Sequence, residues 1–387
     1  MRKAAGLQPM HLFDSHMEVA MNRKCLYLLL LLAWLLAACG GAEQTGTQIP
    51  AETQPGETQA SGPAGERRTL TVMTHDSFAV SEELLETFEA ENNANLQILN
   101  SGDAGTTLNQ AILSRDNPLA DVLYGVDTTF LSRALEEEIF EPYDSPLLSE
   151  IPDQFELDPQ KGALPVDYGD VCLNYDRSYF SEQNLEPPQS LEDLLNEEYA
   201  GLLVVENPAT SSPGLSFLLA TIGHFGEDGY LEFWQGLVEN DLLVVNDWET
   251  AYYSEFSTHG GTRPIVVSYG SSPPAEVVFA ETPIDEPPTE VVTGEGSCYR
   301  QVEYAGILKG TQNRDLAERW IDFMLSRPFQ EDMPLQMFVY PVNENARLPE
   351  VFADFSSIPE QVAEVSPERI AEQREAWIQA WTETVLR

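Results

Sequence analysis

The sequence has 387 residues and is strongly acidic, with 64 Asp and Glu residues against 20 Lys and Arg residues and a formal net charge of −44 at pH 7. Nucleic acids and anionic lipid surfaces bind proteins largely through Lys and Arg, so this composition argues against both as partners. An acidic surface attracts cations, which leaves open a small cationic ligand.

The N-terminal region has the features of a secretory signal. Met21 is a plausible start, because basic residues and then the apolar run 25–38 follow it. The run ends in LAAC at residues 36–39, which resembles a bacterial lipobox, where the cysteine becomes the lipid-modified first residue of the mature protein. We therefore expect a signal peptide with an upstream extension at residues 1–38, and a protein anchored by lipid at Cys39 outside the cytoplasmic membrane. An ordinary cleaved signal is the alternative.

Residues 39–68 are predicted to be a flexible linker, because small and polar residues dominate them and leave too little apolar surface to bury. The roughly 320 residues that follow exceed one comfortable hydrophobic core and suit two lobes. This region contains two cysteines, Cys172 and Cys298. In an exported protein they suggest one disulfide, and neither has the neighbours of a metal site.

Strands and helices alternate at the start of the folded region. Strands are predicted at residues 70–74, 96–99 and 120–124, and helices at 81–91 and 108–114. Such alternation is typical of a parallel sheet, and ligands bind beyond the carboxyl ends of its strands. The polar residues that follow these strands are therefore expected near one crevice: His75, Asp76, Ser77, Asp103 and Asp127.

Residues 165–176 predict a long extended segment that carries more polar residues than a core strand needs. We interpret it as a strand that crosses between the two lobes.

A strand, a turn and a helix follow one another closely in the middle of the chain. Residues 202–205 predict a buried strand, and residues 215–222 predict the apolar body of a helix. The turn between them, NPATSSP at residues 207–213, offers hydroxyl caps and a proline in the first helical turn. Because a helix start can hold a polar or anionic ligand group, Ser211 and Ser212 are candidate binding residues. An ordinary capped helix is the alternative.

The remaining elements complete an α/β pattern. Helices are predicted from Ser190, around Phe233 and Trp234, at 251–256 and at 314–324, and strands at 242–245, 264–269 and 299–308. Phe233 and Trp234 are expected in the core.

Ten short motifs, in this order, resemble the thiamine-binding proteins of bacterial ABC importers, over essentially all of residues 69–387. They are HDSF (75–78), ADVLYGVD (120–127), PVDYG (165–169), PPQSLEDL (187–194), NPATSSPGL (207–215), DWETAY (247–252), VSYGSSP (267–273), QVE (301–303), YPV (340–342) and EQREAWIQAW (372–381).

The resemblance implies an α/β protein with the two-lobed type II periplasmic-binding-protein fold and hinge crossing strands, near residues 167–171 and 302–306. Cys172 and Cys298 would lie close to these crossings, which supports their pairing. The expected lobes are residues 69–166 with 304–335, and residues 167–303 with 336–387.

The resemblance also implies a binding site for thiamine or its phosphates, with no cofactor and no catalysis. Aromatic rings and carboxylates would hold the flat cation, and a phosphate would rest on the turn 210–214. Closure would signal to the permease and ATPase of the importer, and a monomer is expected. The expected ligand-binding residues are His75, Asp76, Ser77, Asp103, Asp127, Ser211, Ser212, Trp248, Tyr252, Tyr269 and Phe338.

Two of these positions depart from the family. His75 stands where the family usually has Tyr, and Phe338 stands where it usually has Trp. Both changes keep a flat ring and alter its hydrogen bonding, so they bear on which form of the vitamin is preferred.

Three other functions remain open. The adjacent Tyr252 and Tyr253 suit a ferric-ion receptor of the same fold, although successive helical residues should point in different directions. A polyamine would also suit acidic residues between aromatic rings. A serine hydrolase lacks support, because no GxSxG motif is present and His224 and His259 show no triad pattern.

Overall fold

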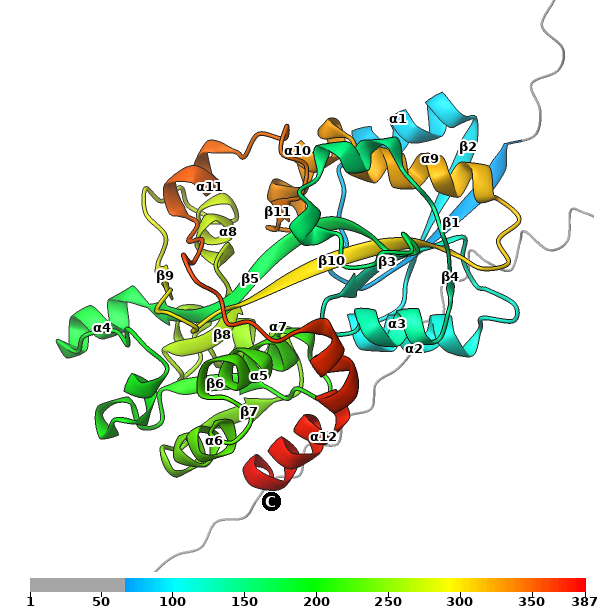
Figure 1. The fold of residues 1–387 in the computed structure, drawn as a ribbon. Coiled ribbons are helices and arrows are strands. Elements are labelled where there is room, and N and C mark those ends of the chain that lie inside the picture. Colours follow the sequence, from blue (N-terminus) through cyan, green and yellow to red (C-terminus); the bar gives the residue numbers. More distant parts are fainter. Residues whose placement is uncertain (1–66) are drawn as a thin grey trace, which may run out of the picture. The chain divides into compact units, whose positions relative to one another are not determined.

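A mixed sheet runs through residues 67–387, the part of the chain that the computed structural model describes (Figure 1). Within these residues the sheet has 11 strands. They are β1 (Arg68–Thr74), β2 (Ala94–Asn100), β3 (Val122–Asp127), β4 (Phe140–Glu141), β5 (Leu164–Asp176), β6 (Leu203–Glu206), β7 (Leu243–Val245), β8 (Ile265–Tyr269), β9 (Thr289–Val292), β10 (Tyr299–Leu308) and β11 (Tyr340–Pro341).

The strand order is β2-β1-β3-β10-β5-β8-β6-β7. At one end β1 runs parallel to β2 and β3, and at the other end β6 runs parallel to β7 and β8. The two long central strands, β5 and β10, are antiparallel to each other and to their outer neighbours β8 and β3. The sheet is therefore parallel toward its ends, as predicted for the strands within residues 70–124, and antiparallel at its centre.

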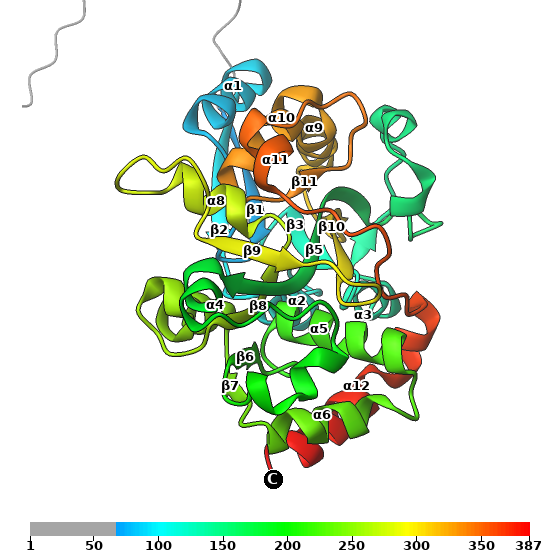
Figure 2. The same ribbon diagram turned by 90° about the vertical axis from the view of Figure 1, so that its left-hand side faces the viewer.

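The helices cover both ends of this sheet. They are α1 (Glu82–Asn92), α2 (Ala104–Leu113), α3 (Leu131–Glu136), α4 (Arg177–Gln183), α5 (Ser212–Phe225), α6 (Tyr230–Glu239), α7 (Trp248–Thr250), α8 (Ser272–Val278), α9 (Arg314–Leu325), α10 (Arg327–Gln336), α11 (Glu350–Phe355) and α12 (Pro367–Val385). In Figure 2, α5, α6 and α12 lie together near β6 and β7, whereas α1 and α9 lie near β1. Within residues 67–387, no helix has the length and apolar character needed to cross a membrane.

Most elements agree with the sequence patterns, and one helix does not. The region from Ser190 forms only a 3-10 turn at Glu192–Leu195, where Ser190 Oγ accepts a hydrogen bond from the Asp193 N–H group. Four residues are too few for the amphipathic helix that was expected.

Two large clusters of buried side chains form the core. The first contains Trp320 and is built from β1, β3, α9 and the start of β5. The second contains Trp234, as expected, which packs edge to face against Trp381 of α12 at 5.4 Å between ring centroids. Each cluster excludes water around its own aromatic centre, and β5 and β10 contribute residues to both.

Residues just after 336 pack with the first cluster. Met337 and Val339 contact it, and Val342 is part of it. β11 pairs with β5 at the middle of the crossing region, at Tyr168 and Asp167. The chain therefore returns toward the second cluster only after β11.

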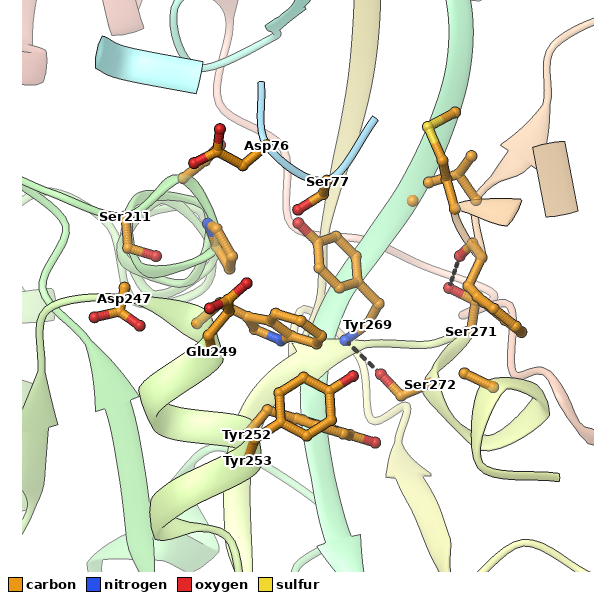
Figure 3. A pocket seen from close by; sticks show the side chains of 18 of the residues that line it. Asp76, Ser77, Ser211, Asp247, Glu249, Tyr252, Tyr253, Tyr269, Ser271 and Ser272 are labelled. Atoms are coloured by element: carbon orange, nitrogen blue, oxygen red, sulfur yellow. Dashed lines mark hydrogen bonds between the residues drawn. The ribbon is translucent and has the colours of Figure 1, made fainter. Parts of the chain in front are cut away.

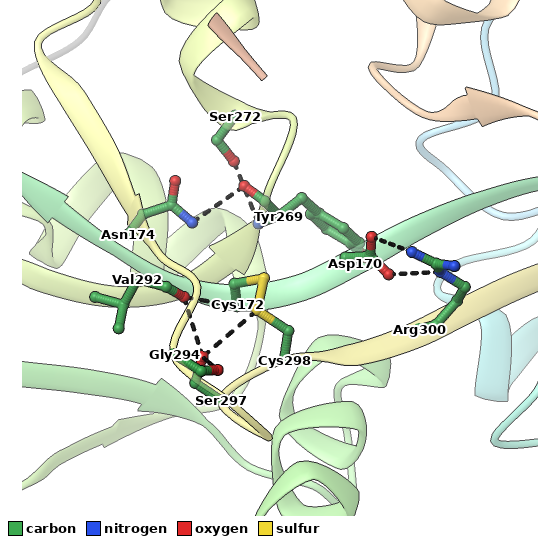
Figure 4. Close-up of a disulfide and its surroundings, with 10 residues drawn as sticks. All are labelled: Asp170, Cys172, Asn174, Tyr269, Ser272, Val292, Gly294, Ser297, Cys298 and Arg300. Carbon is green, nitrogen blue, oxygen red and sulfur yellow. Dashed lines mark hydrogen bonds and ion pairs between the residues drawn. A yellow bond between two sulfur atoms is a disulfide. The ribbon is translucent and has the colours of Figure 1, made fainter. Parts of the chain in front are cut away.

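The crossing strands β5 and β10 are joined by a strand ladder, a disulfide and an ion pair (Figure 4). They pair from Tyr299↔Val171 to Ala305↔Leu164, and Cys172 is joined to Cys298 by a disulfide beside this ladder. Arg300 donates two hydrogen bonds of 2.8 Å to the buried carboxylate of Asp170. These contacts hold β5 and β10 in register on the side of the second cluster.

Candidate functional site

All eleven residues expected to bind a ligand line one cavity of about 920 Å³. Its lining combines the loops after β1 and β2, the start of α5, the segment around α7, and the crossing strands. Figure 3 draws 18 of the lining side chains and labels ten of them, among them Asp76, Ser211, Asp247 and Tyr269. The cavity thus lies where residues from both core regions meet.

One side of the cavity is aromatic. Trp248, the first residue of α7, stacks on Tyr252 with ring centroids 5.1 Å apart and an angle of 21° between planes. Its indole N–H donates to Ser268 Oγ at 3.0 Å, and Tyr269 lies edge-on at 6.5 Å. Tyr252 is only 3% exposed, so it supports Trp248 from behind. We call Trp248, Tyr252 and Tyr269 the aromatic wall.

The start of α5 forms as its turn chemistry predicts. Ser211 is the N-cap, its hydroxyl accepts from the Gly214 N–H group at 3.4 Å, and Pro213 lies in the first turn. Gly214 is required because a β-carbon there would lie 2.6 Å from the carbonyl oxygen of Glu206. The helix therefore packs directly against the end of β6.

Asp127 lies in the lining, but its carboxylate is already occupied. Oδ1 accepts from the backbone N–H of Thr129 at 2.7 Å and from its hydroxyl at 2.5 Å. Oδ2 accepts from Gln301 Nε2 at 2.6 Å and from the hydroxyl of Ser212. Asp127 thus connects β3 to α5 through Ser212 and to β10 through Gln301. Asp127 and Ser212 are hydrogen-bonded to each other.

The loops after β1 and β2 bring acidic residues to the opposite side. Asp76 accepts from the Gly102 N–H group at 3.1 Å and donates its own N–H to the Gly102 carbonyl at 2.9 Å. Asp103 caps α2 by accepting from Thr106 N–H at 2.8 Å. Both carboxylates remain exposed, as does Ser77, so they keep oxygens free toward the cavity.

The crossing strands place a group of titratable side chains at the base of the cavity. His75 Nε2 lies 3.0 Å from Oε1 of Glu303, an ion-pair distance without hydrogen-bond alignment. Tyr124 donates its hydroxyl to Asp167 at 2.7 Å, or to Glu303 at 3.0 Å. We call Asp127, Asp167 and Glu303, which are neighbours across β3, β10 and β5, the carboxylate floor.

Burial and neighbouring charges shift the pKa values of His75, Asp167 and Glu303. Burial raises the pKa of Asp167 well above its usual value, and the negative charge of Glu303 raises it further. Burial also opposes ionisation of Glu303, but His75 outweighs it and lowers the pKa of that carboxyl. Burial disfavours a charged His75 ring, yet Glu303, Asp127 and Asp76 raise its pKa overall. These shifts favour a protonated Asp167 beside an ionised Glu303.

His75 owes its position to a glycine. Gly125 has φ of +92°, and a β-carbon there would lie 2.2 Å from Cδ2 of the His75 ring. The absence of a side chain at Gly125 lets the His75 ring approach β3 closely and reach Glu303.

Phe338 lies at the rim. Its backbone has φ of +56°, which is rare for a bulky residue, and its carbonyl accepts from the Ser271 hydroxyl at 2.5 Å. Its ring stacks on Phe352 at 5.9 Å and contacts Phe279 at 5.1 Å. Phe338 is thus held by apolar neighbours, with no polar ring atom to offer.

Both Tyr252 and Tyr253 line the cavity, with 5.3 Å between their ring centroids and an angle of 81° between the ring planes. Residues 251–255 form a π-helix, which changes the angle between successive side chains. Tyr252 donates to Glu276 at 2.6 Å, and His259 Nε2 lies 3.1 Å from the same carboxylate oxygen. Burial, and then the charge of Glu276, raise the pKa of Tyr252 well above its usual value, which opposes the tyrosinate form that iron prefers.

Several lining residues were not predicted. Asp167 and Gln301 belong to motifs that the sequence shows, but only the pairing of β5 with β10 brings them to the cavity. Glu276 lies on α8, where a single acidic residue in a short helix gives no signal in the sequence. A carboxylate such as Asp167 inside a continuous buried strand was the one sign available.

Comparisons with known proteins agree with this arrangement. The family of bacterial extracellular solute-binding proteins matches residues 117–357. The thiamine-binding periplasmic protein of Salmonella typhimurium is 30% identical over 334 residues, which are 84% of this chain and 96% of that protein.

Solved structures show the same fold. A periplasmic thiamin binding protein has a TM-score of 0.72 and 27% identity, covering 85% of this chain and 100% of that chain. Iron-bound HitA from Pseudomonas aeruginosa has a TM-score of 0.68 at 18% identity, covering 82% and 99%, and so shares the fold alone. These likenesses confirm the predicted two-lobed α/β fold, and the chain belongs to the family of bacterial extracellular solute-binding proteins.

Proposed function

We propose that this protein is an extracytoplasmic receptor that binds thiamine between its two lobes and delivers it to an ABC importer. The observation that carries the proposal is the face of Trp248, stacked on Tyr252 and turned toward a cavity rich in carboxylates. Similarity to thiamine-binding periplasmic proteins supports the same ligand.

The arrangement suits a flat organic cation. Aromatic faces attract cations by about 0.5 to 2 kcal/mol each, and carboxylates near the rings complete the neutralisation. The exposed oxygens of Asp76 and Asp103 face the aromatic wall from the other side of the cavity. Binding needs no chemical change of the ligand.

We propose that the lobes close by bending at β5 and β10, and that the permease recognises the closed form. A ligand that touches both sides stabilises closure, because its contacts are complete only in that form. The eleven expected residues are the proposed contacts, with Asp127 and Ser212 acting mainly on each other and Tyr252 acting through Trp248.

Lipid attachment at Cys39 and a monomeric state are also part of the proposal. Cys39, the signal peptide and the linker up to residue 66 lie outside the described residues. A tether of that composition would let the receptor reach the permease while staying at the membrane.

Ferric ion is the second candidate, because Tyr252, Tyr253, His259 and Glu276 gather at one place in the lining. Against it, no group of three or more His, Cys, Asp and Glu side chains within residues 67–387 is arranged to hold a metal ion. A polyamine would use the same carboxylates as thiamine.

Calorimetric titration of residues 65–387, which form one compact unit, tests the proposal. The protein is unfolded and refolded first, to remove any ligand carried from the cell. Submicromolar binding of thiamine, with spermidine and ferric citrate silent, is the expected result. Binding of ferric citrate with a tyrosinate absorbance band, or of spermidine alone, would replace thiamine with that ligand.

A further inference from the structure

We propose that residues 280–286, in the loop between α8 and β9, form a lid that closes over a cationic ligand in the cavity. This inference rests on the proposed thiamine-binding function and adds a second moving part to it, separate from the bending of β5 and β10. Figure 2 shows the loop in yellow beside α8, where it projects from the rest of the protein.

The loop lines the cavity although it is exposed. Ala280, Glu281 and Ile284 belong to the lining, as does Phe279, which directly precedes the lid. Phe279 is 69% exposed and Ile284 is 37% exposed, and both are large and apolar. Apolar side chains left exposed at the rim of a cavity mark a surface that binds something. When the lid closes, these two side chains lie over the ligand.

Few bonds hold the middle of the loop in its present position. Within the described residues 67–387, residues 280–285 make no hydrogen bond, and residues 281–286 are all exposed. Segments with exposed and unbonded backbone are the ones that move at least cost. Pro283 restricts the chain in the middle of the loop, so less entropy is lost when the lid becomes ordered.

The two ends of the loop are anchored. At the start, the ring of Phe279 contacts that of Phe338, with 5.1 Å between centroids. At the end, Arg177 donates its backbone N–H to the carbonyl of Pro288 and its Nη1 to the carbonyl of Pro287, both at 3.0 Å. Fixed ends and an unbonded middle confine the motion to the lid itself.

The charges of the loop oppose closure over an empty cavity. The lid carries Glu281 and Asp285, and the lining has nine Asp and Glu residues within residues 67–387. The basic side chains of this lining are His75 and His259, each within 3.1 Å of a carboxylate oxygen. Like charges repel, so the acidic lid stays away from an acidic cavity. A cation between them replaces this repulsion with attraction, and the lid closes.

Hydrogen exchange on residues 65–387, with and without thiamine, tests the lid. The backbone amides of residues 280–286 are expected to exchange at least about fivefold more slowly when calorimetry shows that thiamine is bound. The end of α2 around Leu113, which is exposed and outside the lining, should not change. Unchanged exchange of residues 280–286 in the thiamine-bound protein would overturn the inference.

A double substitution, Phe279→Ser with Ile284→Ser, removes the apolar surface of the lid. Thiamine should then dissociate at least about tenfold faster, and its association rate should change less, because the lid acts after the ligand has entered. Leu113→Ser, at a residue that is 87% exposed and outside the lining, is the matched control and should keep the wild-type rates. An unchanged dissociation rate in the double variant would contradict the proposal.

A second pair, Glu281→Gln with Asp285→Asn, separates the lid from the bending of the lobes, because it acts without a ligand. In the ligand-free protein at low salt, residues 280–286 should exchange more slowly in this variant than in the wild type. The difference should shrink at high salt, which screens the repulsion in the wild type. Equal exchange at low salt would mean that charge does not hold the lid open, and the inference would fall.

These results are distinct from a failure of the proposed function. Thiamine binding in calorimetry without slower exchange of the lid would overturn this inference alone. Absence of thiamine binding would overturn the proposed function and this inference together.

Discussion

The aromatic wall and the carboxylate floor belong to one cavity and are stabilised in different ways. Trp248 keeps one face open and is fixed from behind by Tyr252 and by a single hydrogen bond to Ser268. Asp127 and Asp167 on the floor are fully buried, and four hydrogen bonds converge on Asp127 alone.

The difference separates two tasks. The floor joins β3, β5, β10 and α5, so its carboxylates act on the protein itself. The aromatic wall keeps ring surface that faces the cavity, so we expect it to contribute contacts to the ligand. Substitutions in the floor should therefore change stability, and substitutions in the wall should change affinity.

The largest effect is expected from Asp127→Ala. The change leaves the N–H and hydroxyl of Thr129 and the hydroxyl of Ser212 without their acceptor at a buried position, while the Gln301 amide keeps Ser212 Oγ as an acceptor. Since each buried unpaired donor costs about 1 to 3 kcal/mol, a loss of about 3 kcal/mol in the free energy of unfolding is expected. Chemical denaturation measures it.

Asp127→Asn is the matched control, because it keeps an acceptor oxygen and should lose less. An unchanged unfolding free energy in Asp127→Ala would place Asp127 among the ligand contacts and remove the distinction between floor and wall.

Trp248→Ala should show the opposite pattern. The indole is only half-buried, so the fold should tolerate its loss, whereas thiamine affinity should fall by about 30-fold, the equivalent of about 2 kcal/mol. Titration calorimetry and a melting curve on the same sample separate the two quantities. Trp248→Phe keeps a flat ring and should lose less affinity. A mutant that unfolds but binds normally while folded would mean that Trp248 is structural.

The sequence predicted which residues line the cavity better than it predicted the hydrogen bonds within the carboxylate floor. The turn 207–213 has a local signature, since Ser211 caps and Pro213 opens a helix wherever they occur together with an apolar run. The rule that ligands lie beyond the carboxyl ends of strands correctly predicted that His75, Asp103 and Asp127 line one cavity.

The role of Asp127 could not be predicted in this way. Its partners Ser212 and Gln301 lie 85 and 174 residues away in the sequence. Gln301 reaches Asp127 because β10 pairs antiparallel with β3. A pattern of alternating strands and helices does not predict this antiparallel pairing. Similarly, the π-helix at 251–255 has no local signal, so the segment was predicted only as a helix.

His75 gives the floor a pH dependence. Its pKa in the folded protein is raised above the usual 6.5 because Glu303, Asp127 and Asp76 outweigh burial. The stability from the charged ring is complete below about pH 6.5 and is lost as the pH rises through the higher folded-state value. The melting temperature should therefore fall above that pH, and His75→Gln should give a flatter profile. His224→Gln, whose ring pairs with Glu192 outside the cavity lining, should keep the wild-type profile. A steep profile in His75→Gln would move the pH dependence to another group.

The smallest loss in the free energy of unfolding is expected from Asp167→Asn. Burial and the charge of Glu303 raise the pKa of Asp167 well above 3.8, which favours its neutral form, and an amide oxygen can accept the Tyr124 hydroxyl in its place. A carboxyl with a raised folded-state pKa favours the folded protein below 3.8, and this contribution is lost as the pH rises through the folded-state value. Asp167→Asn removes that loss, so at neutral pH the variant should be no less stable than the wild type, and its free energy of unfolding should depend less on pH. Denaturation of both proteins across this pH range measures the difference. A loss as large as that expected for Asp127→Ala would mean that Asp167 acts in its charged form.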